Sequence, residues 1–432
     1  MDIIARRASV ERTQTELLRP LLHTGKALYF FAGALMVLIV WFGYALYIQL
    51  SQGLFVTAMR TPVGAAWGGY IANFVFYVGL AHGGIAIAAA IRLLNLTKYQ
   101  PVARVGEVLT VISLMMAGLS IMIDMGRPDR IFNIIIYLPE RIGSSSLSWD
   151  VTVIILYFTL SATFLWLTMR KDLALSIHRF PRLGLLYKIL LIGYTPDEEK
   201  TINRMTWWLS IAILFLVVML SGGVVAWIFG LLPARPGWFS ALAGPYFLTA
   251  AIASAIAAVI VVSAIVRSAF RWQNYMESGI FRGLGTFLGI ITLFYVYLIL
   301  AEQLTMRYSA PLAEFLISVK LLEGEFAVIF WPMLVVGFFI PSLLLIVQGV
   351  RPRWFSLIRT VIAAGLIVIA FWIKRFLIVV PSLLRPLLPF PEGSYSPSWV
   401  EWSVTIGVLA LAVLLYIGFL KVFPILDLSE EE

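Results

Sequence analysis

A few ionisable side chains lie inside long apolar segments near the start of this chain. His82 lies midway along one such segment, and Asp124 ends the next one. A charge at membrane depth is costly, so such a residue usually marks a pathway or a binding site. A histidine and a partly buried carboxylate can both accept protons near neutral pH. These two residues could therefore take the two protons that a quinol loses when it is oxidised.

Each of these residues also has a purely structural interpretation. His82 is flanked by glycines, which let another helix or a ligand come close, but it could equally be a buried histidine with satisfied hydrogen bonds. Asp124 could pair with Arg127 and close the end of its helix. Arg104 and Glu107 are three residues apart, so they could form an ion pair on one helix face.

Other polar residues extend the pattern along the chain. Asn73 precedes His82 by nine residues and lies on a similar helical face, nearer the outer side. Further on, Glu302, Lys374 and Arg375 fall toward the outer ends of their apolar segments. These residue types fit a quinol headgroup site with a proton route, but transporters use the same types.

The composition predicts the elements that hold these residues. Of the 432 residues, 61% are hydrophobic and 13% are charged, against roughly 25% charged in a soluble domain. Apolar runs of about 20 residues, each long enough to cross a bilayer, recur along the chain. We therefore expect an all-α polytopic membrane protein with about ten transmembrane helices. The expected spans are 26–50, 66–94, 101–125, 149–170, 205–229, 243–270, 282–306, 325–348, 355–380 and 399–423.

The basic residues predict the orientation of these helices. If residues 1–26 lie on one side, that side holds 22 of the 32 Lys and Arg residues and the other side holds 10. Cytoplasmic loops carry the excess of Lys and Arg, so both termini should be cytoplasmic. The net charge of +9 then reflects the topology, and the expected partner is the lipid bilayer, with no nucleic acid.

A weak internal repeat predicts the domain organisation. The pattern Gly-x-x-Leu-x-x-Ile-x-Leu occurs at residues 106–114 and again at 285–293. Chance similarity between two apolar helices is the alternative. A true duplication would give two four-helix units, near 66–229 and 243–380, with one flanking helix at each end. The expected regions are a cytoplasmic segment (1–25), the first helix with the first unit (26–230), the second unit (243–380), and the last helix with a cytoplasmic tail (381–432).

The chain has no cysteine and three histidines. The absence of cysteine excludes thiolate-held iron–sulfur clusters, covalent haem and disulfides. His82 is the one histidine in an apolar span, whereas a b-type haem commonly needs two. We therefore expect no redox metal and no metal site in this chain. Electrons would move through a diffusible organic molecule or through a partner.

Several motifs resemble the NrfD/PsrC family of membrane subunits. The similarity is densest over 60–155 and thinner to about 345. The segments that carry it are Trp67–Gly84, Arg104–Glu107, Gly126–Arg130, Ser148–Asp150, Glu302–Thr305 and Phe330–Pro341.

The resemblance implies a role in a respiratory complex. Family members are quinone-reactive subunits of polysulfide, nitrite and related molybdenum–iron–sulfur reductases, and of alternative complex III. This implies a quinone site near the outer face, with menaquinone as the expected substrate. It also implies an iron–sulfur subunit docked there, and molybdopterin or multihaem cytochrome subunits in the same complex. The chain would be an enzyme only as the quinone-reactive part of that oxidoreductase.

Matching the family motifs assigns expected roles to single residues. Alternative complex III relatives often carry His where Asp124 stands, which favours the polysulfide-reductase type. By the match, His82 and Asp124 are the expected catalytic residues. The expected quinone-binding residues are Asn73, Tyr70, His82, Asp124 and Arg127, and the expected proton route passes Arg104, Glu107 and Glu302.

Two alternatives remain from other functional classes. A secondary transporter would also show about ten spans and an internal repeat. It predicts helices broken near the midplane in both halves, with Pro341 as the main candidate. A membrane anchor without a quinone site is the other alternative. In each case the expected location is a prokaryotic cytoplasmic (inner) membrane.

Overall fold

The computed structural model describes residues 14–60, 65–232, 235–308, 311–385 and 392–428. All regular structure in these ranges is helical, which confirms the predicted all-α fold. Ten helical spans in the described residues are long and apolar enough to cross a membrane, as expected. They are α3 (Lys26–Gln52), α4 (Gly69–Leu93), α5 (Gln100–Asp124), α8 (Ser146–Ser176), α10–α11 (Glu199–Met219 and Val225–Gly230), α12 (Ala243–Phe270), α13 (Ser278–Tyr308), α15–α16 (Ala327–Pro332 and Ile340–Val350), α17 (Leu357–Leu383) and α18 (Trp399–Val422). The shorter helices are α2 (Arg19–Leu22), α6 (Phe132–Ile136), α7 (Leu138–Arg141), α9 (Gly184–Leu190) and α14 (Leu312–Leu322).

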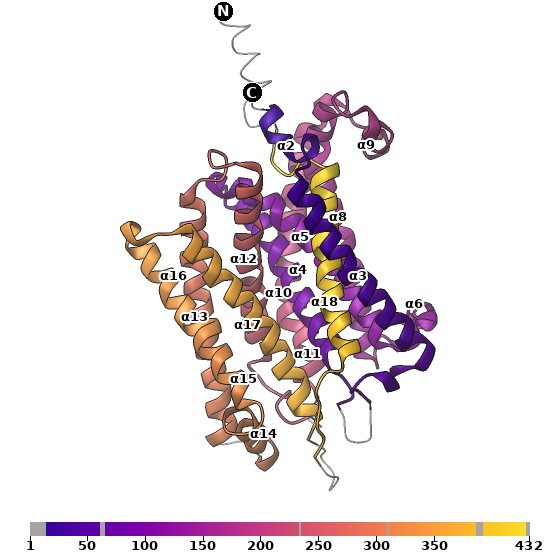
Figure 1. Cartoon of the computed structure of the whole chain (residues 1–432), viewed down its shortest axis with the longest axis vertical. Helices are drawn as coiled ribbons and strands as arrows, with labels where there is room; N and C mark the ends of the chain where they lie inside the picture. Colours follow the sequence, from indigo (N-terminus) through magenta and orange to yellow (C-terminus); the bar gives the residue numbers. More distant parts are fainter. Residues whose placement is uncertain (1–13, 61–64, 233–234, 309–310, 386–391, 429–432) are drawn as a thin grey trace, which may run out of the picture.

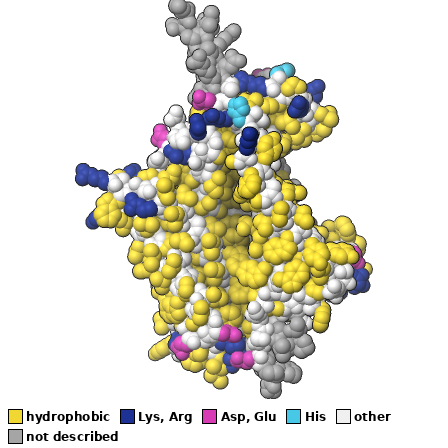
Figure 2. Space-filling model, in the orientation of Figure 1, with side chains coloured by type: hydrophobic (Ala, Val, Ile, Leu, Met, Phe, Trp, Pro, Cys, Tyr) yellow, Lys and Arg dark blue, Asp and Glu magenta, His cyan; other side chains and the backbone are white. Residues whose placement is uncertain are grey.

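The two ends of the bundle differ in what they carry. Figure 1 shows α2 and the end of α18 at one end, which we call the terminal end, and α14 at the opposite end, which we call the far end. The Lys421 ammonium ties the two chain ends together by donating to the carbonyls of Pro20 and His23, both at 2.7 Å. Figure 2 shows an apolar belt between two charged ends, with Lys and Arg gathered near the terminal end. Of the basic residues counted for topology, Arg6, Arg7 and Arg12 lie outside the described residues.

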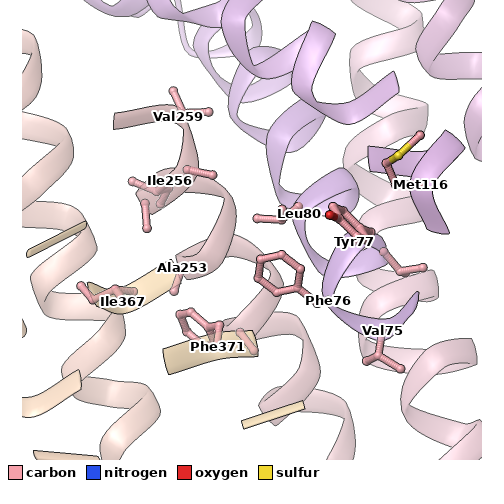
Figure 3. Packing of buried hydrophobic residues seen from close by; sticks show 14 of the residues in the cluster. Val75, Phe76, Tyr77, Leu80, Met116, Ala253, Ile256, Val259, Ile367 and Phe371 are labelled. Carbon is pink, nitrogen blue, oxygen red and sulfur yellow. The ribbon is translucent and has the colours of Figure 1, made fainter. Parts of the chain in front are cut away.

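Helix α4 lies at the centre of the bundle. In its most apolar window 89% of the residues are buried, against 17% for α3. It contacts α5, α10, α12, α17 and α18. Figure 3 shows Phe76 and Leu80 of α4 directed toward Ala253 of α12 and Phe371 of α17. Most side chains of α4 are therefore held between neighbouring helices rather than facing lipid.

Glycines allow these helices to approach closely. A Cβ on Gly83 would clash with the carbonyl oxygen of Ala251 in α12. A Cβ on Gly84 would lie 2.9 Å from the carbonyl oxygen of Gly106 in α5. Small residues at such contacts are typical of membrane helix packing. The glycines beside His82 therefore serve helix contact, which was one of the two interpretations of the sequence.

Two spans contain π-helical turns. One turn covers Leu220–Val224 between α10 and α11, and the other covers Met333–Phe339 between α15 and α16. The expected break at Pro341 is therefore displaced toward the turn that precedes it, where the helix widens but stays helical. A widened turn lets a helix accommodate a proline that cannot donate a backbone hydrogen bond.

Candidate functional site

Asp124 lies at the far end of α5 and is 5% exposed. Its carboxylate Oδ2 accepts a hydrogen bond from Arg60 at 2.8 Å, and Arg60 also donates to the Asp124 carbonyl at 2.8 Å. The other carboxylate oxygen, Oδ1, is buried without a hydrogen-bond partner. The buried carboxylate thus has one paired oxygen and one oxygen that can accept a further donor.

The structural alternative, in which Asp124 pairs with Arg127, is not what the structure shows. Arg127 is 63% exposed at its side chain and pairs with Asp129 at 2.9 Å. This pair lowers the pKa of the Asp129 carboxyl through the Arg127 hydrogen bond. Gly126 explains the difference, because its φ of +68° turns the chain away from the end of α5. Arg127, an expected quinone-binding residue, therefore lies on the surface.

We call Asp124, its partner Arg60 and the adjoining end of α5 the Asp124 region. Tyr70 is fully buried next to it. Its hydroxyl donates to the Gln49 side chain at 2.6 Å, and the Gln49 amide donates to the Ile123 carbonyl at 2.9 Å. Gln49 belongs to α3, so this chain of bonds joins α3, α4 and the end of α5. Tyr70 thus lies in the expected neighbourhood, two hydrogen bonds away from the helix end that carries Asp124.

Asn73 lies deeper on α4 and bridges two other helices. Its amide donates to the Thr405 hydroxyl of α18 at 3.1 Å, and its carbonyl accepts from the Trp372 indole of α17 at 2.7 Å. The side chain is 2% exposed. Both ends of the amide already have protein partners, so Asn73 holds the helices together around the Asp124 region.

His82 lies in a separate cluster on the opposite face of α4 from Asn73. The expected similar face is wrong, because nine residues at about 100° each leave the two side chains half a turn apart. Its Nδ1 lies 2.6 Å from the Ser221 hydroxyl oxygen, and its ring meets the Tyr157 ring edge-on at 4.6 Å. The Tyr157 hydroxyl donates to the His82 carbonyl at 3.2 Å. Ser221 belongs to the π-helical turn Leu220–Val224. Such turns are frequent at functional sites, and this one directs a hydroxyl at the one histidine in a span.

Asp150 is a buried carboxylate that our reasoning from the sequence did not select. It is 6% exposed near the far end of α8, and no hydrogen bond or ion pair to its carboxylate is found among the described residues. Asp150 and Tyr157 are seven residues apart, so they share one face of α8 about 10 Å apart along the axis. The Ser-Trp-Asp motif at 148–150 stands out in the sequence, and the apolar residues that follow it indicate burial.

The structure does not bring His82 and Asp124 into contact. His82 is 13 residues along α4 from Gly69, or about 20 Å deep, whereas Asp124 lies at a helix end. No hydrogen bond or ion pair joins them in the part of the chain that the structure describes. The different depths agree with the sequence, which did not require a direct contact.

An apolar groove runs along the membrane-facing side of α5 and α8. It has a volume of about 370 Å³. Nearly all its lining is apolar, and it reaches Met122 and Ile154, close in sequence to Asp124 and Asp150. Residues that line it include Leu114, Gly118, Met122, Ile154 and Phe158.

At the terminal end, Arg104 and Glu107 take different partners from those expected. Arg104 forms an ion pair with Asp172 of α8 at 2.6 Å, and Glu107 accepts a hydrogen bond from Thr168 at 2.9 Å. The structural alternative of an Arg104–Glu107 ion pair is therefore not formed, because α8 supplies a partner to each residue. Arg104 also donates to carbonyls of the C-terminal segment, at Pro424 and Leu426.

A polar cavity of about 750 Å³ lies at this end, between α4, α5, α8 and α10. Its lining mixes both signs of charge with uncharged polar groups. Glu107 lines the cavity although it is only 4% exposed. Other charged residues in the lining are Arg92, Arg104, Lys171, Glu199 and Asp427.

Glu302 of α13 forms an ion pair with Lys374 of α17. Its carboxylate lies 3.4 Å from the Lys374 ammonium, which also lies 5.1 Å from the centre of the Tyr246 ring. Lys374 and Arg375 are each 2% exposed. Glu302 therefore belongs to a buried charged cluster of its own, apart from both Asp124 and His82. Among the described residues, no group of three or more His, Cys, Asp or Glu gathers as a metal site would require.

Comparison with known proteins agrees with this arrangement. Residues 55–386 match the family described as "Polysulphide reductase, NrfD". The membrane subunit of a putative dimethyl sulfoxide reductase from Halobacterium salinarum is 31% identical, over 87% of each chain. A subunit of the selenate reductase of Mesobacillus selenatarsenatis is 24% identical, over 90% of this chain and 92% of that protein. An Hdr-like menaquinol oxidoreductase integral membrane subunit of Archaeoglobus fulgidus is 23% identical, over 89% of this chain and 90% of that protein.

The matched region contains the Asp124 region, the His82 cluster and the polar cavity's helices. Together with ten described helical spans that are long and apolar enough to cross a membrane, the match makes the chain a multi-pass integral membrane protein. The chain belongs to the NrfD polysulphide reductase family.

Proposed function

We propose that this chain is the quinone-reactive integral membrane subunit of a multisubunit respiratory oxidoreductase. The observation that carries the proposal is the set of buried proton acceptors near the far end, namely Asp124, Asp150 and the deeper His82. Oxidation of a quinol releases two electrons and two protons. The carboxylates and the imidazole take the protons, and the electrons pass to an iron–sulfur partner at the far end.

The apolar groove between α5 and α8 supports a quinone as the substrate. An isoprenoid tail is a long apolar chain that enters from the bilayer, and the groove is apolar and faces the membrane. It runs toward the helix ends that carry Asp124 and Asp150. A headgroup whose tail lies in this groove is therefore directed toward the two buried carboxylates.

Relatives support the molybdoenzyme type of complex. Two of them are named as subunits of dimethyl sulfoxide and selenate reductases. We propose that this chain oxidises quinol for a reductase of that kind, with a molybdopterin subunit beyond the iron–sulfur subunit. The name of the Archaeoglobus fulgidus relative, a menaquinol oxidoreductase subunit, supports menaquinol as the quinol. The alternative parent, alternative complex III, would replace the molybdopterin subunit with a multihaem cytochrome.

We further propose that the chain itself holds no haem. It has no cysteine, and of its three histidines only His82 lies in a described membrane span. The chain isolated from its partners should show no haem absorption band and no bound iron. Stoichiometric haem in that preparation would contradict this part of the proposal.

The polar cavity at the terminal end supports a proton route. It gives water a path to Glu107, which lies about 10 Å along α5 from the terminal end of that helix. We propose that Arg104, Glu107 and, in the second half, Glu302 assist proton movement across the membrane. A Glu107→Gln variant should then reduce proton uptake from the terminal side in sealed vesicles and leave quinol oxidation in uncoupled vesicles near the wild-type rate.

The test of the quinone site uses the assembled complex in native membranes. His82→Ala and Asp124→Asn should each lower quinol turnover by about 10²-fold, as expected when a general acid or base is lost. The matched controls are His178→Ala and Asp129→Asn, which make the same changes at exposed positions. Neither control should alter turnover. If both site variants assemble and turn over quinol at the wild-type rate, the site is not where we propose.

A further inference from the structure

Glu401 is a buried carboxylate at the start of α18, 1% exposed. One carboxylate oxygen accepts hydrogen bonds from the backbone N–H groups of Ala58 and Ser398, each at 2.9 Å. The other oxygen accepts a short hydrogen bond from the Tyr395 hydroxyl. Three donors therefore satisfy both carboxylate oxygens of Glu401, unlike Asp124, which has one oxygen without a partner.

Two of the three donors tie Glu401 to different parts of the Asp124 region, and the third, Ser398, is the N-cap of its own helix. Ala58 precedes Arg60 by two residues, and Arg60 is held in a left-handed conformation with a φ of +57°. The Tyr395 hydroxyl accepts from the Gly69 backbone N–H at 2.9 Å, at the first residue of α4. Glu401 thus fixes both the segment that brings Arg60 to Asp124 and the start of the helix that carries Tyr70.

Gly68 shows how tightly this contact is built. A Cβ at that position would clash with the Tyr395 hydroxyl oxygen, so only glycine fits. Burial, followed by the charge of Glu401, raises the pKa of Tyr395. Its phenol therefore stays protonated and continues to donate to Glu401 throughout the physiological range.

The charges in this region do not balance. Asp124 and Glu401 interact electrostatically, and both act on Tyr70. Among the described residues, Arg60 is the one cation paired with either carboxylate. The other titratable groups that face them are Tyr70 of α4 and Tyr395, and Gln49 of α3 is uncharged. One buried negative charge is left over, and a buried uncompensated charge is costly.

We infer that Glu401 is a positioning residue of the quinol site. It holds Arg60 on Asp124 and supplies the second negative charge, so that the cluster is neutral when it holds one proton. The proton goes to the free Oδ1 of Asp124, since every oxygen of Glu401 is already engaged. This inference rests on the proposed function. In it, one quinol hydroxyl gives its proton to Asp124, and the other gives its proton to Asp150, the second carboxylate of the proposed site. The two electrons leave to the iron–sulfur partner, and both protons then pass to the far-end solvent.

The test is the pH dependence of quinol oxidation by the assembled complex. Oxidation requires ionised Asp124, so kcat/KM falls on the acidic side as this acceptor becomes protonated. Glu401→Gln removes a neighbouring negative charge and should move that acidic limb to lower pH by about one unit or more. Arg60→Gln removes the paired cation and should move it to higher pH. The double variant should lie between the two single variants.

Glu392→Gln is the matched control, because it removes one carboxylate charge on the far-end surface, where Glu392 pairs with Lys320 and Arg385. In this variant, the acidic limb of the kcat/KM profile should stay at the wild-type pH. If Glu401→Gln assembles and its limb does not move, the inference is overturned. If that variant fails to assemble, an unmoved limb in Arg60→Gln overturns it. A wild-type complex that oxidises no quinol would instead overturn the proposed function, and this inference with it.

Discussion

Asn73 shows what a buried polar residue does when its partners are other helices. Its side-chain carbonyl accepts a hydrogen bond from the Trp372 indole of α17, and its side-chain NH2 donates one to the Thr405 hydroxyl of α18. Asn73→Leu would leave the indole N–H buried without an acceptor. An unsatisfied buried donor costs about 1–3 kcal/mol, so we expect a lower thermal unfolding midpoint in detergent. Asn133→Leu makes the same change at an exposed position and should leave the midpoint unchanged. Equal midpoints for the two variants would show that the bridge does not stabilise the bundle.

Asp150 leads to a second prediction at this scale. It shares a helix face with Tyr157, which contacts His82, so it is the carboxylate best placed to pass a proton from His82 to the far end. Asp150→Asn cannot accept a proton, and we expect quinol turnover in the assembled complex to fall by about 10²-fold. Asp150→Glu should retain a larger part of the rate. Full activity in the Asn variant would exclude Asp150 from the route.

Single residues were predictable from the sequence in their burial but not in their partners. His82 and Asp124 stand out because apolar residues surround them, and both are buried as expected. Their partners are distant along the chain: Arg60 lies 64 residues from Asp124, and Ser221 lies 139 from His82. Glu401 lies 343 residues from Ala58. No spacing rule connects such positions, so Arg60 and Glu401 could only be counted as charges near the outer side.

At the scale of elements, close helix contacts lead to a third prediction. Gly83→Ala would place a Cβ against the Ala251 carbonyl and force α4 away from α12. Overpacking of this kind costs about 1–3 kcal/mol, and we expect a lower thermal midpoint and faster proteolysis. Gly118→Ala is the matched control, since it changes the same residue type in a neighbouring helix with no atom within 4 Å of the new Cβ. If the control were as unstable as Gly83→Ala, helix contact would not be the cause.

Hydropathy located the spans well and their polar extensions poorly. Helix α8 was expected to end at 170 but continues to Ser176, and α10 begins at Glu199 rather than 205. These extensions carry charges, which end an apolar run but not a helix when they find partners. Arg170, for example, pairs with Glu198 at 2.7 Å. The sequence did not predict where the π-helical turns lie, because a single widened turn does not change the pattern of apolar residues along a span.

The division into two four-helix units remains a proposal. It rests on the repeated pattern at 106–114 and 285–293. The π-helical turns do not follow it, since one lies in the last span of the first unit and the other in the third span of the second.

At the scale of the whole molecule, the distribution of Lys and Arg predicts which end of the helix bundle faces the cytoplasm. The basic residues divide 22 to 10 between the two sides, and the described ends of the chain lie together at the terminal end (Figure 1). The positive-inside rule then predicts that the terminal end is cytoplasmic. Asp124, Asp150 and Glu401 would face the outside, where the iron–sulfur partner would bind.

The last prediction tests this orientation directly. The chain has no cysteine, so a single introduced thiol reports its own position without background. Ser144 is exposed in the far-end loop, and Lys188 is exposed in α9 at the terminal end. Each is replaced by cysteine in a separate variant, Ser144→Cys and Lys188→Cys. A membrane-impermeant thiol reagent added to intact cells should label Ser144→Cys and should label Lys188→Cys only after lysis. The reverse pattern would invert the topology. It would move the quinol site's proton exit and the electron-accepting partner to the cytoplasmic face, because both depend on which end of α5, α8 and α18 meets the outside.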